Sequence, residues 1–526
     1  MNLAHRSMPG DQLRRPLPLL GFIGLFIVTV YKAANYVIAG DMNGLAYVAL
    51  LFIGCAFVVA MLNSWRNGLY FFLAWLLFED FARKYLGNDM AIYFAKDILV
   101  GVVYLSFFFA YRRKQATSFR PPFLVPLLLF VWFGVLQVFN PASTSLIFGV
   151  LGLKLFFCYV PLLFVGYALL NSEEQLRRFF FVNIVLVLII ASLGIAQSIL
   201  GHTFLNPERP AEEIRELSTN YRVSPVSGLL SYRPTSVFVS TGRFANFMLV
   251  SLLLVVGFLG YLLLRHRKGR HLAFVALALV SSAIVLGAAR GILLWSIGSV
   301  LVFAVAFVWG APWRQREVIR VFRTVQRAAL GISLGLGLLF FAFPEALLSR
   351  VAFYTETLSP GEASQLQSRS WDYPLSNFLG AFGYERWPYG YGIGTLSLGT
   401  QYVSRIFRVK PPTIGVESGF GTIVLEMGVG GLILWFVMSF AILFAAWRVV
   451  KKLRGSVWFP LAFVIFWYAG LLLFPMTFTG MQPYQDFVLN AYLWLLLGIL
   501  FRLPTLAVSA QFTAAAQPPR HIPWMR

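Results

Sequence analysis

The stretch FFFVNIVLVLIIASLGIAQSIL, residues 179–200, decides the fold class of this chain. No charged side chain interrupts it, and the hydrocarbon layer of a membrane requires a helix of about 20 mostly apolar residues. The stretch therefore predicts a transmembrane helix.

Comparable stretches recur along the whole chain. Of its 526 residues, 59% are hydrophobic and 12% are charged, whereas soluble domains average about 25% charged residues. A soluble fold of this length cannot bury so much apolar surface. We therefore expect an all-α polytopic membrane protein with about 12–14 transmembrane helices. The candidate spans are 17–36, 45–62, 68–78, 97–111, 123–139, 146–170, 179–200, 244–264, 272–287, 292–309, 328–343, 420–447, 457–474 and 487–501. The third and fourth flank a charged stretch and are compatible with two spans or with one re-entrant pair.

The basic residues predict which side of the membrane each loop faces. The net charge is +22, from 43 Lys and Arg against 21 Asp and Glu. With the N-terminus inside, the predicted cytoplasmic segments hold 26 basic and 4 acidic residues, and the rest of the chain holds 17 of each. This is the positive-inside pattern. We therefore expect both termini in the cytoplasm, and no nucleic-acid partner is needed to explain the charge.

Two predicted extracytoplasmic loops are long, at 201–243 and 344–419, and we expect short helices within them. They belong to a single integral membrane domain, 1–506, and the Ala-, Pro- and Gln-rich segment 507–526 is predicted to be a disordered cytoplasmic tail. The first apolar run shows no small-residue cleavage site and is predicted to be an uncleaved span. Cys55 and Cys158 both lie in apolar runs, so no disulfide framework is expected.

Arginines gather in the predicted outer half of the protein. Arg233 and Arg243 stand where the first long loop enters a helix, Arg290 stands in the turn of LGAARGILLW, and Arg369 and Arg386 belong to the second long loop. The planar, permanently charged guanidinium suits phosphate or pyrophosphate in a partly desolvated cavity. The alternative is that each arginine extends to the membrane interface or pairs with a carboxylate.

Two carboxylates stand near the end of the second loop, in IGVESGFGTIVLEMGVGG. Glu417 precedes a glycine-rich helix start, and Glu426 lies about two turns into the apolar run. A carboxylate at the mouth of a membrane cavity loses solvation and holds its proton more tightly, as a general base requires. Glu417 is equally compatible with a carboxylate that complements the helix dipole, and we expect Glu426 to pair with an arginine.

Aromatic residues and glycines alternate in WDYPLSNFLGAFGYERWPYGYGIG, residues 371–394. Trp371, Tyr373 and Trp387 are its candidate ligand-binding residues. Such a segment is typical of a sugar-binding groove or of the aromatic belt at a membrane interface, and the sequence leaves both open. No βαβ unit surrounds GYGIG, so it is not a dinucleotide fingerprint.

The histidines argue against two classes of enzyme. Four of the five are predicted to be cytoplasmic, which leaves His202 alone outside. The sequence shows neither a metal-ligand cluster nor the spacing of a Ser-His-Asp triad, and it has no Walker motif. We therefore expect no metal and no cofactor, and no ATP-driven transport by this chain alone.

In its order of motifs, the chain resembles the superfamily of O-antigen ligases and Wzy-type polymerases, which are bacterial membrane glycosyltransferases. The resemblance runs from about residue 78 to residue 502. It rests on FEDFARKYLGNDMAIYFAKDIL, VFNPASTSLIFGVLGLKLFFCYVPLLF, RPTSVFVSTGRFANF, LGAARG, SRSWDY with the later GYGIG, and ESGFGTIVLEMGVGG. Ligases commonly carry a His-Asn pair before the final glycine-rich helix, where this chain has Glu417-Ser418. In that respect it is closer to the SEDS peptidoglycan polymerases, to which a carboxylate base is attributed.

The resemblance implies an enzyme of the bacterial inner membrane whose active site faces the periplasm. It implies an undecaprenyl-pyrophosphate-linked glycan as donor and a glycan or a lipid-linked molecule as acceptor, among membrane lipids. By position, Arg233, Arg290 and Arg369 would hold the pyrophosphate and glycan, Arg243 is a weaker match, and Glu417 would be the base. The implied role is metal-independent, inverting transfer in O-antigen, capsule or exopolysaccharide synthesis. A polymerase is favoured over a ligase because the ligase histidine is missing.

Two other functions fit part of the sequence. A transporter or flippase of lipid-linked glycans would share the helix count and a cationic outer cavity, and it would consist of halves related by a repeat, which the sequence does not show. A non-catalytic assembly protein of an export complex is the second.

Overall fold

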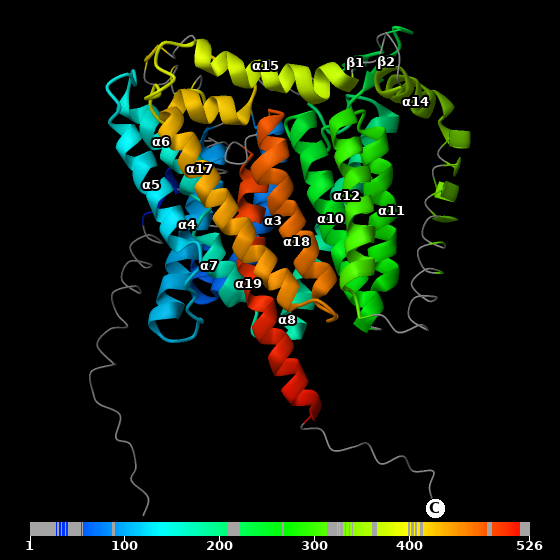
Figure 1. The fold of residues 1–526 in the computed structure, drawn as a ribbon, viewed down its shortest axis with the longest axis horizontal. Coiled ribbons are helices and arrows are strands. Elements are labelled where there is room, and N and C mark those ends of the chain that lie inside the picture. The colour runs from blue at the N-terminus through cyan, green and yellow to red at the C-terminus, as the bar shows by residue number, and fades with distance from the viewer. Residues whose placement is uncertain are drawn as a thin grey trace, which may run out of the picture.

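In a computed structural model, long helices form a bundle that is capped at one end by shorter elements (Figure 1). The structure describes residues 56–515 and a few positions between 28 and 54. Within 56–515 it leaves out 87–89, 208–220, 225, 266–267, 313–322, scattered positions in 324–339, 360–365, 398–399, 401–403, 405–407, 411–413 and 481–485.

The described helices follow one another along the chain with few interruptions. They are α3 (Trp65–Tyr85), α4 (Met90–Arg112), α5 (Leu124–Val138), α6 (Leu146–Phe157), α7 (Leu162–Leu169), α8 (Glu173–Leu200), α10 (Thr241–Arg265), α11 (Arg270–Leu286), α12 (Arg290–Gly310), α14 (Pro344–Leu358), η2 (Ser368–Asp372), α15 (Tyr373–Gly380), η3 (Ala381–Gly383), α17 (Gly419–Lys452), α18 (Phe459–Leu471), η4 (Leu472–Met476) and α19 (Phe487–Ala515).

The fold is that of an all-α polytopic membrane protein, as predicted. Among the described residues, 8 helices are long and apolar enough to cross a membrane, or 9 if the bent pair Ser333–Ala342 and Leu347–Leu358 is one span. This is fewer than predicted, for identifiable reasons. The predicted spans 17–36 and 45–62 lie mostly outside the described residues, and the apolar helices α5 and α11 have only 15 and 17 residues.

Helices α3 and α4 contain the predicted spans 68–78 and 97–111. They have 21 and 23 residues and pack against each other. Lys96 of α4 donates a hydrogen bond to Glu79 of α3 at 3.0 Å, and both side chains are buried. Charged side chains inside a membrane bundle are tolerated when they pair with one another. The charges of α3 therefore do not interrupt the helix.

Both long loops lie at the same end of the bundle (Figure 1). The first contains an antiparallel hairpin of β1 (Tyr221–Val223) and β2 (Leu230–Tyr232), which we did not predict. Residues 208–220 of this loop lie outside the described residues, so the short helices expected in it stay a prediction. Gly228, at φ +68°, stands in the connection of the hairpin and favours a tight turn over a helix. The second loop is helical as predicted, and α15 crosses the end of the bundle.

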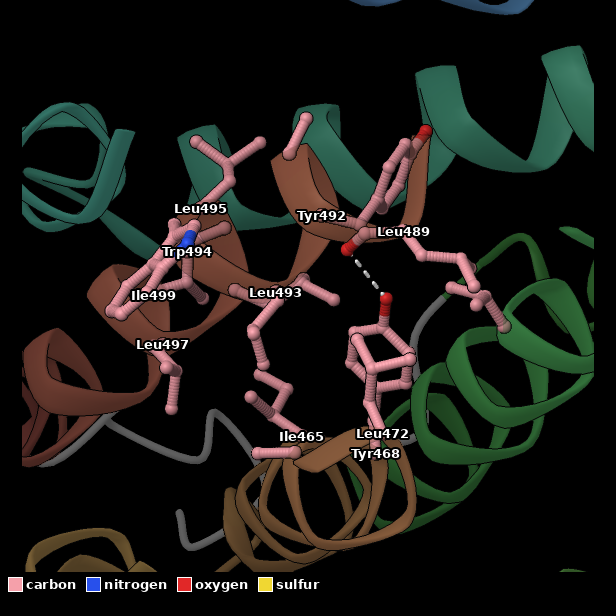
Figure 2. Close-up of a cluster of buried hydrophobic side chains, with 14 of the residues drawn as sticks. Ile465, Tyr468, Leu472, Leu489, Tyr492, Leu493, Trp494, Leu495, Leu497 and Ile499 are labelled. Atoms are coloured by element: carbon pink, nitrogen blue, oxygen red, sulfur yellow. Dashed lines mark hydrogen bonds between the residues drawn. The ribbon is translucent and has the colours of Figure 1, made fainter. Parts of the chain in front are cut away.

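Helices α18 and α19 pack together through large apolar side chains in the protein core (Figure 2). Tyr468 of α18 points toward α19 and donates a hydrogen bond to the carbonyl oxygen of Leu489 at 2.8 Å. A buried hydroxyl needs such a partner, because leaving it without one costs free energy. The bond therefore fixes how the two helices are aligned.

Helix α19 is longer than predicted. It continues to Ala515, into the segment 507–526 that we expected to be disordered. The alanines of this stretch favour a helix. Residues 516–526 lie outside the described part of the chain.

Candidate active site

A pocket of about 780 Å³ opens at the end of the bundle where the two long loops lie. Its walls come from the first turns of α10 and α12, from α14 and β1, and from the segments that precede α17 and follow η4. Ligand sites in proteins commonly measure about 300–1,000 Å³. The pocket is therefore large enough for a sugar phosphate.

Three arginines line this pocket: Arg222 of β1, Arg233 directly after β2, and Arg290 at the start of α12. Burial, together with the nearby charges of Arg222 and Arg290, lowers the pKa of Arg233 to about 10, so its guanidinium stays charged at neutral pH. The Nε of Arg233 is buried, and no described residue accepts its hydrogen bond. A buried donor without an acceptor costs about 1–3 kcal/mol. An anionic ligand that accepts this bond would remove the penalty.

The backbone adds positive potential to the arginines. Helices α10 and α12 both begin at the pocket, which Gly242 and Gly291 of their first turns line. The first turn of a helix carries about half a positive charge, and its free N–H groups bind phosphate readily. Just before α12, the buried Ala288 is held at φ +47°. Such strained positions in residues other than glycine cluster at functional sites.

Glu417 lines the same pocket from the segment before α17. Tyr373 of α15 donates a hydrogen bond to its Oε2, and its backbone N donates to Oδ1 of Asn377 at 3.2 Å. The loss of solvation that we expected for this carboxylate is absent, because Glu417 is exposed. Its orientation is defined instead by the tyrosine. The pocket thus holds Glu417 together with Arg233 and Arg290.

The other predicted arginines lie elsewhere. Arg243 does not line the pocket, and its Nη1 donates to the two carboxylate oxygens of Asp80 at 2.9 and 2.7 Å. Arg386 is exposed in the turn after η3. Arg369 lies in η2, and its side chain is outside the described part of the structure, so its place relative to the pocket stays a prediction. The fold therefore separates Arg243 and Arg386 from the arginines that line the pocket.

The predicted aromatic residues of the second loop also differ in how near they lie to the pocket. Trp371 is 59% exposed and packs against Phe478, with ring centroids 5.9 Å apart. Phe478 is the neighbour of Thr479, which lines the pocket, so Trp371 lies near the pocket. Trp387 packs against Phe382 at 5.2 Å and is half-buried. Trp371 is thus better placed than Trp387 to contact a ligand.

Glu426 has a different partner from the one expected. Its Oε1 accepts a hydrogen bond from the backbone N of Leu396 at 2.9 Å, rather than from an arginine. Nearby, α17 is interrupted at Gly428, whose φ is +69°. Backbone groups of the loop 388–392 bond to the groups that this break frees. The glycine-rich loop therefore braces α17, and because Leu396 lines the pocket, it also fixes one wall.

Arg222 and Asn246 line the pocket although the sequence did not single them out. Arg222 stands in a hairpin strand far from any helix start, which was the signal used for Arg233 and Arg243. Asn246 lies one turn after Gly242 on the same face of α10, so the helical period could have found it.

No family model, no curated protein and no solved structure matches the chain. The part of the chain that the structure describes holds no group of three or more His, Cys, Asp or Glu side chains arranged to bind a metal ion.

Proposed function

We propose that this protein is a glycosyltransferase of the bacterial inner membrane that acts on its periplasmic side. It transfers or polymerises undecaprenyl-pyrophosphate-linked oligosaccharide in O-antigen, capsule or exopolysaccharide synthesis. One observation carries the proposal: a single pocket combines three arginines, two helix N-termini and one carboxylate. Arginines and helix N-termini can stabilise a departing pyrophosphate, and a carboxylate can take the proton of a hydroxyl group. The Glu417-Ser418 pair favours a polymerase over a ligase.

The proposed reaction is a direct displacement. The acceptor hydroxyl gives its proton to the carboxylate of Glu417 as its oxygen bonds to the anomeric carbon of the donor. The bond from that carbon to the pyrophosphate oxygen breaks, and the electron pair leaves with the undecaprenyl pyrophosphate. Arg233 and Arg290 stabilise the negative charge that develops on the leaving group. Attack from the side opposite the leaving group inverts the anomeric carbon.

A lipid-linked donor fits the surroundings of this pocket. Arg290 is the first residue of α12, and the outer face of that helix exposes apolar side chains. They are Leu294, Ile297, Val300, Leu301, Val305 and Val308. A polyprenyl tail can follow this face in the membrane while its pyrophosphate reaches the arginines. A water-soluble nucleotide sugar would gain nothing from it.

The remaining predicted residues contact the glycan or support the pocket. Trp371 offers an exposed aromatic face beside the pocket for a sugar ring. Tyr373 orients Glu417. Arg369, Arg386 and Trp387 are assigned to the more distant parts of the glycan. Arg243, which pairs with Asp80, is moved from ligand binding to support of the pocket wall.

The deciding experiment measures bond formation by the purified protein. The protein is reconstituted with undecaprenyl-pyrophosphate oligosaccharide, and lengthened glycan and released undecaprenyl pyrophosphate are quantified. Glu417→Gln should lower turnover by about 10²- to 10⁴-fold, the usual contribution of a positioned base, while donor binding persists. Glu385→Gln is the matched control, since Glu385 is exposed in the same loop but does not line the pocket. Equal turnover by wild type and Glu417→Gln would remove Glu417 as the base.

A second candidate function is transport of the lipid-linked glycan without transfer. Buried ion pairs inside the bundle favour it, because ionisable residues within membrane helices often mark transport or proton pathways. Glu79 and Lys96 form such a pair at 3.0 Å. In sealed vesicles, donor that crosses the membrane unchanged, with no glycosidic bond formed for any acceptor, would establish transport and refute the glycosyltransferase proposal.

A further inference from the structure

The segment 233–243 joins two walls of the pocket. Arg233 lines the pocket at its start, and Gly242 lines it near its end. Between them, Ser236 is fully buried and held at φ +50°. An L-residue other than glycine adopts this backbone conformation only when its surroundings enforce it.

Two buried side chains from different helices hold this strained turn. Lys84 of α3 donates from Nζ to Oγ1 of Thr235 at 2.8 Å and to the carbonyl oxygen of Ser236 at 2.7 Å. From the other side, Oε1 of Gln197 on α8 accepts the backbone N–H groups of Thr235 and Ser236, at 2.8 and 2.7 Å. Lys84 is 1% exposed, and the other three residues are fully buried. The turn is therefore fixed from both sides without water.

The far end of the segment is held by the same helix. Asp80 lies one turn before Lys84 on α3. Its Oδ2 accepts the backbone N–H of Val239 at 3.3 Å, and both of its carboxylate oxygens accept Nη1 of Arg243. Helix α3 thus hydrogen-bonds to the segment 233–243 at two points, through Lys84 and Asp80, although neither residue lines the pocket.

We propose that Lys84 is a positioning residue: it holds the Thr235–Ser236 turn in its strained form and so keeps Arg233 facing the pocket. Asp80 performs the same task for the start of α10. This positioning role involves contacts within the protein alone. The consequence for glycan transfer rests on the proposed function, in which Arg233 binds the donor pyrophosphate.

The test compares matched substitutions of two buried lysines. Lys84→Met keeps the length of the side chain and removes the donor. Lys96→Met is the control, because Lys96 is equally buried but pairs with Glu79 and does not reach the turn. Ser236→Gly serves as the rescue, since glycine adopts a positive φ at little cost and no longer needs the lysine.

In the transfer assay, Lys84→Met should raise the KM for the lipid-linked donor by about tenfold, since small displacements in a site have effects of this order. Its kcat should fall as well, because Arg233 also stabilises the charge that develops on the leaving group. The double variant Lys84→Met with Ser236→Gly should have a donor KM close to that of wild type. A structural role alone predicts no rescue, because the glycine restores neither the lost charge nor the lost hydrogen bonds. Failure of the rescue, or an equal KM change in Lys96→Met, would overturn the proposal.

A second readout does not depend on the enzymatic activity. Cysteine at Gly291 projects into open space beside Arg290, so Gly291→Cys is introduced with Cys55→Ser and Cys158→Ser. The ratio of its labelling rates with anionic and cationic methanethiosulfonate reagents reports the charge of the pocket. Lys84→Met should lower this ratio by about threefold, as Coulomb's law gives for a guanidinium displaced by a few ångströms, and Lys96→Met should not. An unchanged ratio in Lys84→Met refutes the positioning role, whereas a lowered ratio in a protein without transferase activity refutes only the proposed function. If Lys84→Met does not fold, Gln197→Met takes its place under the same criteria.

Discussion

Tyr373→Phe tests whether the orientation of Glu417 matters for the proposed reaction. The substitution removes one hydroxyl group, which donates a hydrogen bond to Oε2 of Glu417. The backbone of Glu417 stays in place, because its N–H still bonds to Asn377 at 3.2 Å and Ser418 still caps α17. The variant therefore changes the freedom of one carboxylate and little else.

The size of the effect follows from that freedom. A glutamate side chain that is released from a fixed rotamer regains at most about 1.5–2 kcal/mol of conformational entropy. Glu417 is exposed, so water already competes for its oxygens and we expect about half of this value. Since about 1.4 kcal/mol corresponds to a tenfold change, kcat should fall by about three- to fivefold. The free energy of unfolding should change by less than about 0.5 kcal/mol, because the lost hydrogen bond joins Tyr373 to an exposed carboxylate that water also solvates.

The assay is steady-state glycan transfer with purified protein, in which kcat and the donor KM are measured separately. Tyr384→Phe is the matched control: its hydroxyl donates to the carbonyl oxygen of Gly415 at 3.2 Å, in the same segment, and leaves the carboxylate of Glu417 untouched. A kcat of Tyr373→Phe equal to that of Tyr384→Phe would show that the orientation of Glu417 is irrelevant. The reasoning would then be wrong even if Glu417→Gln were inactive.

Three further predictions concern the framework around the site. Gly394→Ala places a Cβ 2.1 Å from the carbonyl oxygen of Phe148, at a backbone φ of +85°. It should lower the free energy of unfolding, measured by thermal unfolding in detergent, by about 2–4 kcal/mol. Gly383→Ala is the control and should match wild type, because its Cβ would meet nothing within 4 Å. Hydrogen bonds from the hairpin turn lower the pKa of Glu356 below its ordinary value of 4.5. The bonds to Glu356 should therefore hold above that pH and weaken as the pH falls through the lowered value, so that hydrogen exchange at the turn accelerates there. Glu356→Gln should show fast exchange at every pH, and a flat pH profile in wild type would contradict the assignment. Tyr468→Phe removes the bond between α18 and α19 and should lower the free energy of unfolding by about 1 kcal/mol, and unchanged thermal unfolding would show that this bond does not hold the two helices together.

The sequence predicted the helical class because membrane spans are coded locally. A run such as 179–200 must form a helix in a membrane whatever else the chain does, because no water is available to bond its backbone. Helices interrupted by charge were harder to predict. The charges of α3 are satisfied by residues from other segments: Glu79 meets Lys96, which lies 17 residues later in the chain, and Asp80 meets Arg243. The hairpin at 221–232 was missed because short strands give weak local signals.

The candidate site was predictable only in its chemistry. The residue types and their place in outer loops singled out Arg233, Arg290 and Glu417, since permanently charged guanidinium groups and a carboxylate stand out in an apolar chain. Whether they meet depends on how segments about 130–180 residues apart fold over the same end of the bundle. The same packing pairs Arg243 with Asp80, so Arg243 does not line the pocket. The sequence by itself thus determined the membrane helices and the types of reactive side chain, because each of these depends on the residues of a single segment. The tertiary structure decided which charges pair with each other and which line the pocket, because ion pairing depends on distance in space and not on distance along the chain.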